Sequence, residues 1–202
     1  NDAGEIIQRN FAGTPSDKEA ILAKMFTLLK ELKREADRLQ LNIKGIGAST
    51  GGRVDYEAGV IVDSTALLPG WRDVPLRELL NAELRLPARI ENDGNCAALA
   101  EQMFGEGRDS SDYLSLVLGT GIGGGVVVND ELVRGVKNAA AELGHISIDY
   151  NGPQCSCGNR GCVELYASGS GLARLANELV KSGTITLPNI SPNEWTAQSL
   201  GE

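Results

Sequence analysis

The only histidine of the chain and three of its four cysteines lie in one short segment, residues 144–164. One imidazole and three thiolates form a complete tetrahedral ligand set for zinc, and the candidates are His145, Cys155, Cys157 and Cys162. A proline and several glycines in the segment indicate tight turns that let the ligands converge. A disulfide or separate buried thiols are the alternatives. Because closed sites of this composition are usually structural, we expect the metal to shape a loop beside which the chemistry takes place.

The composition argues against two broad classes of function. The chain has 202 residues and a net charge of −8 at pH 7. Because phosphate backbones attract basic patches, this charge argues against nucleic-acid binding by this segment. No apolar run is long enough to cross a bilayer, so we expect no membrane partner. Thiols gathered in a metal-like cluster suit a reducing cytosol, and we expect a cytoplasmic protein.

Both ends of the sequence look interrupted. Residues 1–4 predict a hairpin turn and Glu5–Gln8 its outgoing strand, so we expect the incoming strand to lie upstream. Residues 196–202 look like the first turn of an unfinished helix.

The order of the predicted elements indicates an α/β fold. A capping box at Ser16–Glu19 begins an amphipathic helix whose apolar residues recur at helical spacing as far as Leu39, and we expect it to cover a sheet. We expect further helices at 74–84, from about 92–95 towards Met103, and at 171–181, strands at 43–46, 59–62, 87–91 and 114–118, and a hairpin turn at 129–130. Folds of this kind bind ligands at the loop edge of the sheet.

A glycine-rich segment, Gly119–Gly125, lies between two predicted strands. Glycines let backbone N–H groups approach phosphate oxygens, and Thr120 can add a hydroxyl donor. The segment is not a Walker loop, because no Gly-Lys-Ser/Thr follows, and it does not open a helix as a dinucleotide-binding motif would. The alternative is a flexible hairpin that binds nothing.

Asp93 follows a predicted strand, at the edge where α/β folds place their sites. Asn92 and Asn95 supply neutral polar groups beside it, and Gly94 lets a ligand come close. A carboxylate here could accept the proton of a hydroxyl that attacks a phosphoryl group. The alternative is that Asp93 caps the helix that follows, and it could serve both roles.

Glu142 and Glu164 lie on either side of the cysteine cluster. If the cluster binds a metal, the metal would hold both carboxylates at one place. Carboxylates that accept hydrogen bonds from vicinal hydroxyls are a common means of binding a sugar. Seen alone, each is more often a solvated surface charge.

Together these segments resemble the ROK group of repressors, open reading frames and sugar kinases. The resemblance covers residues 43 to about 175 and is carried by Gly119–Gly125, by Glu142–His145 and by the pattern Cys-x-Cys-Gly-x-x-Gly-Cys-x-Glu at 155–164. It implies an actin-like (ribonuclease-H-like) ATPase fold with two lobes around a cleft. Residues 1–92 would form an N-terminal α/β lobe without its first strand, and residues 93–202 the start of a C-terminal α/β lobe with a zinc-binding knuckle.

Within that group, a finer resemblance points to the N-acetylmannosamine kinase domain of bifunctional UDP-N-acetylglucosamine 2-epimerase/N-acetylmannosamine kinases. The stretches that carry this likeness are Ser49–Val54, Glu91–Glu101, Ala140–His145 and Gly152–Gly158. Bacterial glucokinases share most of them, often with Ala in place of Gly94. The resemblance implies transfer of a phosphoryl group from ATP to the 6-hydroxyl of N-acetylmannosamine, with glucose and N-acetylglucosamine as alternative sugars.

The resemblance also implies roles for single residues. Asp93 would be the base that deprotonates the sugar 6-hydroxyl. The sugar would contact Gly52, Arg53, Thr65, Asn92, Asp93, Glu142, His145 and Glu164. The ATP phosphates, bound with Mg2+, would contact Gly119, Thr120, Gly121 and Gly123. Zn2+ would be bound by His145, Cys155, Cys157 and Cys162, with the second ring nitrogen of the histidine free for a sugar hydroxyl. A homodimer is usual in the group, so we expect one here.

One motif of the group, Asp-x-Gly-Gly-Thr on the first hairpin, is missing from the sequence, and we expect it upstream. Three other functions stay open: a glucokinase, a sugar-responsive transcriptional repressor with a helix-turn-helix segment upstream, and an inactive zinc-bound sugar-binding module. Asp93 and Gly119–Gly125 favour a kinase, because a repressor needs no ATP site.

Overall fold

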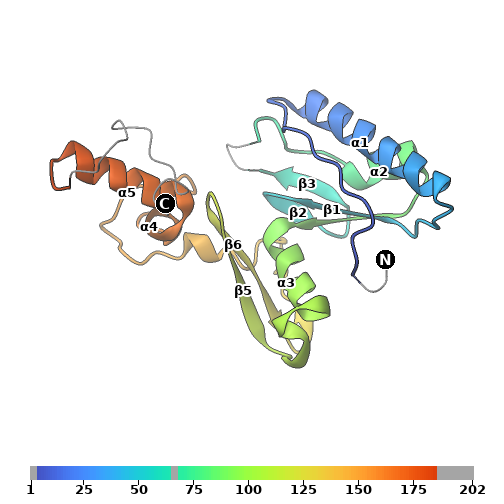
Figure 1. Ribbon diagram of the computed structural model, residues 1–202. Coiled ribbons are helices and arrows are strands. Elements are labelled where there is room, and N and C mark those ends of the chain that lie inside the picture. Colours follow the sequence, from blue (N-terminus) through green and yellow to red (C-terminus); the bar gives the residue numbers. More distant parts are fainter. Residues whose placement is uncertain (1–3, 65–67, 186–202) are drawn as a thin grey trace. The chain divides into compact units, whose positions relative to one another are not determined.

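The computed structural model describes residues 4–64 and 68–185, and this part of the chain forms two compact units of helices and strands (Figure 1). The first unit contains the described residues up to Cys96 together with residues 134–139, and the second contains residues 97–133 and the described residues from 140 onwards. The expected mixture of α and β elements is confirmed. The division into lobes at residues 92 and 93 stays a prediction.

The first unit is built from strand pairs and helices that cover them (Figure 1). Strand β1 lies parallel to β4 with Thr50 opposite Asn92, so both strands end at the same edge. Strands β2 and β3 form an antiparallel hairpin. The elements are α1 (Lys18–Arg38), β1 (Ile46–Thr50), β2 (Arg53–Asp55), β3 (Val60–Asp63), α2 (Leu76–Leu84), β4 (Ala88–Asn92) and α3 (Asp93–Phe104), which begins directly after β4 and continues into the second unit.

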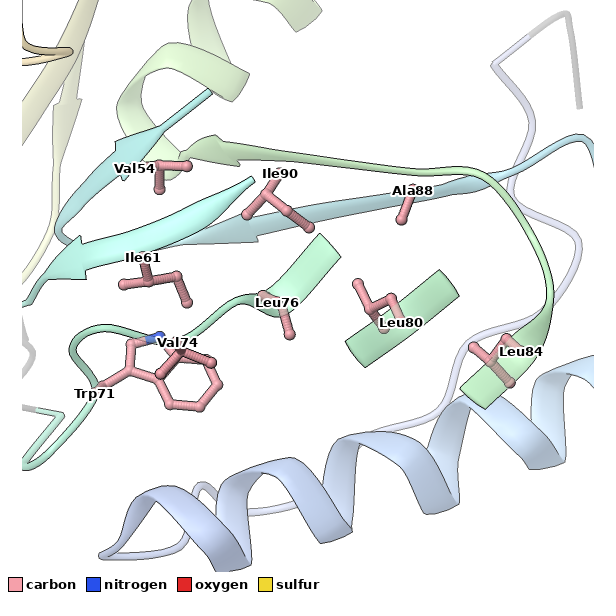
Figure 2. Close-up of a cluster of buried hydrophobic side chains, with 9 residues drawn as sticks. All are labelled: Val54, Ile61, Trp71, Val74, Leu76, Leu80, Leu84, Ala88 and Ile90. Carbon is pink, nitrogen blue, oxygen red and sulfur yellow. The ribbon is translucent and has the colours of Figure 1, made fainter. Parts of the chain in front are cut away.

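A cluster of buried apolar side chains forms the core of the first unit, and Figure 2 shows it between the strands and helix α1. Helix α2 contributes Leu76, Leu80 and Leu84, which are spaced four residues apart and buried. Side chains of α1 pack on the cluster and stay partly exposed. Burying one leucine contributes about 1.5–3 kcal/mol, so this cluster explains why the amphipathic helix predicted from the sequence lies against the sheet.

The second unit is built around an antiparallel sheet in the order β5-β6-β7. The hairpin between β6 and β7 turns at Asn129 and Asp130, whose φ angles of 51° and 64° fit the two-residue turn predicted from the sequence. The other elements are short turns and two consecutive helices. The bounds are η1 (Glu106–Asp109), β5 (Tyr113–Leu118), β6 (Ile122–Val128), β7 (Glu131–Leu132), η2 (Leu143–His145), α4 (Glu164–Ala167) and α5 (Gly169–Lys181).

Most boundaries differ from those expected by one or two residues, and three differences have a clear structural cause. Helix α1 is capped by Asp17 rather than Ser16, because the Asp17 carboxylate accepts the Ala20 N–H at 2.9 Å. Strand β1 runs over residues 46–50 rather than 43–46, because its backbone pairs with residues 88–92. The glycine segment is a turn only as far as Gly121, because Ile122 and the glycines after it pair with β5.

The strand expected at Glu5–Gln8 is absent, because no described segment pairs with that backbone. The hairpin turn expected at 1–4 falls largely outside the described residues, as do Thr65 and the helix expected at 196–202. Within the described ranges, every helix is too short or too polar to cross a lipid bilayer.

Replacing Leu80 with alanine should remove a side chain that is 0% exposed from the centre of the core. We expect the free energy of unfolding to fall by about 2–5 kcal/mol, because a cavity remains where the methyl groups were. Urea unfolding of the full-length protein measures the change. The neighbouring exposed Asn81→Ala is the control and should change stability by less than about 0.5 kcal/mol. Equal effects of both substitutions would contradict this account of the core.

Candidate functional site

Asn92 lies at the end of β4 and joins the two strand ends of the first unit. Its Nδ2 donates to the Gly52 carbonyl at 3.0 Å and to Asp93 Oδ1 at 3.1 Å. Its Oδ1 accepts the Asn95 N–H at 3.1 Å, which is the contact of a helix-capping side chain. Asn92 therefore caps α3. The alternative prediction, that Asp93 is the cap, is wrong, because Asp93 is already the first residue of the helix.

Asp93 is the first residue of α3, and its side chain is exposed. Oδ1 accepts hydrogen bonds from Asn92 Nδ2 and from the Gly94 N–H at 3.0 Å. Among the described residues Oδ2 has no hydrogen-bond partner, and a Cβ placed on Gly51 would lie 3.8 Å from it. One carboxylate oxygen is thus fixed while the other can accept a proton, and the helix N-terminus favours its negative charge.

Arg53 begins β2 and forms an ion pair with Asp63 at the end of β3, with 2.6 Å between Nη2 and Oδ2. Gly52 precedes it with a φ of 93°, and a Cβ there would collide with the backbone of Asp63 and Ser64. Only glycine fits this close approach. The hairpin therefore places Arg53 beside the loop that Asn92 holds, and Asp63 is a neighbour that sequence reasoning did not assign.

Two further residues were missed at this site. Glu91, buried at the end of β4, pairs with Arg134, whose guanidinium lies 3.9 Å from the centre of the Tyr56 ring. The sequence gives no separate signal for Glu91, because its strand also contains the charged Arg89 and the polar Asn92. Nothing in the sequence marks Arg134, which is far along the chain.

In the second unit, the one imidazole and three thiols singled out from the sequence do converge. The ligand atoms of His145, Cys155, Cys157 and Cys162 all lie within 4.8 Å of one another, and all three thiols are free. The Cys157 and Cys162 sulfurs are 3.7 Å apart, close to the edge of about 3.8 Å of a tetrahedron with zinc–sulfur bonds of about 2.3 Å. The nitrogen that faces Cys155, at 3.6 Å, is Nδ1. The cluster therefore fits a tetrahedral metal ion.

The thiols of the cluster have shifted pKa values, because the cluster is partly buried and its members contact one another. Burial raises the pKa of the Cys162 thiol to about 12, and the two neighbouring thiols add to the rise. Burial also raises the pKa of Cys155, whereas a hydrogen bond from the Asn159 backbone lowers the pKa of Cys157. A divalent cation would supply the positive charge that stabilises such crowded thiolates.

Glu164, the first residue of α4, lies against this cluster. Its Oε1 is 3.3 Å from both Cys155 Sγ and His145 Nδ1. Its Oε2 would lie 3.1 Å from a Cβ placed on Gly121. Glu142 precedes η2, is exposed, and accepts the His145 N–H through its carbonyl at 3.0 Å. Glu164 therefore lies between the cluster and the glycine turn, and Glu142 is joined to the cluster through its backbone.

The glycine segment has two separate structural roles. Gly119–Gly121 form the turn between β5 and β6, and the first turn of α5 fixes it, because the Ser170 hydroxyl donates to the Thr120 carbonyl at 2.6 Å. Gly123–Gly125 lie within β6. A Cβ on Gly124 would collide with the Ser115 carbonyl and lie 2.8 Å from Leu143, and a Cβ on Gly144 would collide with Ile122. Part of the segment therefore lets η2, which carries His145, pack on the sheet.

The structure thus gathers the expected site residues into two groups. One group, in the first unit, holds Gly52, Arg53, Asn92 and Asp93. The other, in the second unit, holds the glycine turn, Glu142, Glu164 and the four metal-ligand candidates. Thr65 lies outside the described residues. The roles of all these residues in binding and catalysis stay predictions.

The chain matches known proteins along almost its whole length. A family model described as the ROK family matches residues 1–200. A candidate xylose repressor from Caldicellulosiruptor sp. (strain Rt8B.4) is 41% identical over 185 residues, which make up 91% of this chain and 46% of that protein. The chain therefore spans about half the length of the curated relatives it matches.

The solved structures that resemble this fold include two sugar kinases, one of them a candidate. A ROK family glucokinase from Streptomyces griseus, in complex with glucose and AMPPNP, matches with a TM-score of 0.76 and 31% identity, over 91% of this chain and 57% of that one. A candidate N-acetylmannosamine kinase from Listeria monocytogenes matches with a TM-score of 0.79 and 33% identity, over 100% of this chain and 63% of that one. These likenesses confirm the α/β, actin-like fold.

Replacing Gly124 with alanine should displace η2 and reduce the metal content of the protein, because the new Cβ meets the Ser115 backbone and Leu143. The control is Gly123→Ala, where a Cβ meets nothing within 4 Å, so it should keep its metal. Cys157→Ser, which removes one ligand candidate, sets the level expected for metal loss. The readout is the number of zinc ions bound per purified full-length chain, measured by inductively coupled plasma mass spectrometry. Equal zinc in Gly124→Ala and Gly123→Ala would contradict the packing argument.

Proposed function

Since this chain belongs to the ROK family, we propose that the full-length protein is an ATP-dependent sugar kinase. It transfers the γ-phosphoryl group of ATP to the 6-hydroxyl of a hexose or an N-acetylhexosamine. The observation that carries the proposal is the carboxylate of Asp93. One of its oxygens is fixed by Asn92 and Gly94, and the other has no partner among the described residues.

The first unit supplies the groups that act on the sugar. Asp93 Oδ2 accepts the proton of the 6-hydroxyl, while the amide of Asn92 and the loop at Gly52 and Arg53 orient the sugar. Such transfer depends on in-line positioning and on stabilisation of charge, to which Mg2+ contributes. General-base assistance of this kind contributes about 10²–10⁴ in rate.

The second unit supplies the nucleotide and metal groups. The turn at Gly119–Gly121 offers the backbone N–H groups of Thr120 and Gly121 to the ATP phosphates, whereas the Gly119 N–H donates to the Gly121 carbonyl at 3.0 Å. Ser170 keeps that turn in place. The four ligand candidates bind Zn2+, which supplies structural cross-linking of the loop. Glu142 and Glu164 then accept hydrogen bonds from sugar hydroxyls. The solved glucokinase in complex with AMPPNP supports ATP as the phosphoryl donor.

N-acetylmannosamine is the sugar we propose, and glucose is the alternative. The similarity to the Listeria monocytogenes protein, at 33% identity over the whole chain, supports the first. The Streptomyces griseus glucokinase supports the second. We further propose a homodimer in the cytoplasm, as is usual in the group.

A second candidate function is sugar-responsive repression of transcription. It is favoured by the 41% identity to a candidate xylose repressor. A helix-turn-helix sequence upstream of this chain would decide for the repressor, and an Asp-x-Gly-Gly-Thr motif upstream would decide for the kinase. The exposed carboxylate of Asp93 and the glycine turn at Gly119–Gly121 favour the kinase, because a repressor needs neither a base nor an ATP site.

Release of ADP by the full-length protein, with ATP and Mg2+, tests the proposal across N-acetylmannosamine, glucose and N-acetylglucosamine. Turnover on one sugar establishes the kinase and identifies its substrate. Sugar binding without turnover on any of the three would move the assignment to the repressor.

Asp93→Asn should lower kcat by about 10²–10⁴-fold, because the amide cannot accept the proton, while affinity for the sugar stays nearly unchanged. Calorimetric titration with the sugar measures that affinity. The control is Asp17→Asn, which changes another exposed aspartate at a helix N-terminus of the same unit and keeps the cap. Lost sugar affinity with retained turnover in Asp93→Asn would overturn its role as the base.

A further inference from the structure

Glu91 is the only charged side chain among the buried residues that the structure describes, and the residue is 7% exposed. A buried carboxylate is costly unless it is paired and hydrogen-bonded. It lies directly before Asn92 and Asp93, at the end of β4. A buried charge directly before the proposed site residues suggests that Glu91 has a role in that site.

Both oxygens of Glu91 are used, and each faces a different part of the first unit. Oε1 accepts the Asn92 N–H at 2.9 Å and Asn95 Nδ2 at 3.0 Å, so it fixes the junction of β4 and α3. Oε2 accepts Arg134 Nε at 2.7 Å. The carboxylate therefore connects the junction to a residue that is distant in sequence.

Arg134 is held in place from its other side. Its guanidinium lies over the Tyr56 ring, 3.9 Å from the centroid, which is a favourable cation–π arrangement. The Arg134 side chain is 27% exposed. Residues 134–139 belong to the first unit, like Tyr56 and Glu91. Three segments of one unit thus meet at this ion pair.

The contacts continue from Glu91 to the proposed base. Asn95 donates its side-chain amide to Glu91 and its backbone N–H to Asn92 Oδ1. This fixes which end of the Asn92 amide is the acceptor, so that Nδ2 faces Gly52 and Asp93 Oδ1. The orientation of the Asp93 carboxylate therefore depends on Asn92, and that of Asn92 depends on Glu91.

We propose that Glu91 is a positioning residue of the kinase site, which orients Asn92 and Asp93 towards the sugar, and that Arg134 holds Glu91 for this purpose. The proposal rests on the proposed kinase function. Glu91 itself touches neither the sugar nor ATP. A displacement of reacting groups by about 1 Å can lower the rate by about 10²-fold, so a contact two steps from the base is sufficient to govern kcat.

The test compares Glu91→Gln and Arg134→Gln in the full-length protein, with kcat expressed per folded chain. Glutamine keeps the shape of Glu91 but faces one of its donors with an N–H group. We expect kcat to fall by about 10- to 100-fold in Glu91→Gln, with a smaller change in the KM for the sugar. Arg134→Gln should lower kcat in the same direction, and it carries the test alone if Glu91→Gln fails to fold.

Three controls separate positioning from a purely structural role. Arg134→Lys keeps a cation opposite Glu91 and should retain most of the wild-type kcat. The double variant Glu91→Gln/Arg134→Gln should be no slower than Glu91→Gln alone, because both changes break one connection. Leu80→Ala destabilises the same unit from its core and should leave kcat per folded chain within about twofold, since the apolar cluster to which Leu80 belongs contains neither Glu91 nor Arg134.

The outcomes separate this proposal from the kinase proposal. If the wild type is active and both glutamine variants keep its kcat, the positioning role of Glu91 is wrong and the kinase assignment stands. An equal loss of kcat in Leu80→Ala would also overturn that role, because stability would then explain the effect. A wild type that phosphorylates no sugar would overturn the kinase assignment, and the role of Glu91 with it.

Discussion

The parallel pairing of β1 with β4 is the constraint on which the candidate site residues of the first unit depend. Its register places Thr50 opposite Asn92, so both strands deliver their following residues to one edge of the sheet. One strand leads into Gly51–Arg53 and the other into Asp93. The pairing joins segments that are distant in sequence, and the apolar core beneath it supplies the stability. A polar loop and a helix N-terminus become neighbours only through this pairing.

In the second unit the corresponding constraint is the convergence of four ligand atoms. The turn that carries His145 and the loop that carries the cysteines have little regular structure of their own. Single backbone bridges, between Ser147 and Cys162 and between Gln154 and Arg160, hold this segment, and the four ligand atoms converge within it. Glu164, which lies 3.3 Å from both Cys155 and His145, takes its position from the same cluster. Backbone pairing therefore orders both groups of candidate site residues, through an extended parallel pair in the first unit and through single bridges in the second.

The parts of the structure that could be predicted from the sequence are those with a local signal. The apolar spacing of α1, the turn at Asn129–Asp130 and the ligand types around His145 each indicate their structure within a few residues. The start of β1 was expected too early, because its partner strand sets where pairing begins. The partner of Glu91 could not be expected, because Arg134 lies 43 residues away and no local pattern joins them. The second role of the glycine segment was missed for the same reason, since it depends on the approach of η2.

The packing of η2 on β6 has a consequence for how sequences of this kind are compared. A side chain on Gly144 would meet Ile122 of β6, and one on Gly124 would meet both Ser115 of β5 and Leu143 of η2. A related chain that had stopped binding nucleotides would still need both glycines to keep its histidine in place. Part of the glycine-rich signature would then survive the loss of enzymatic activity. Under the kinase function proposed above, the position equivalent to Asp93 and the turn at 119–121 would distinguish a kinase from a regulator better than the number of glycines does.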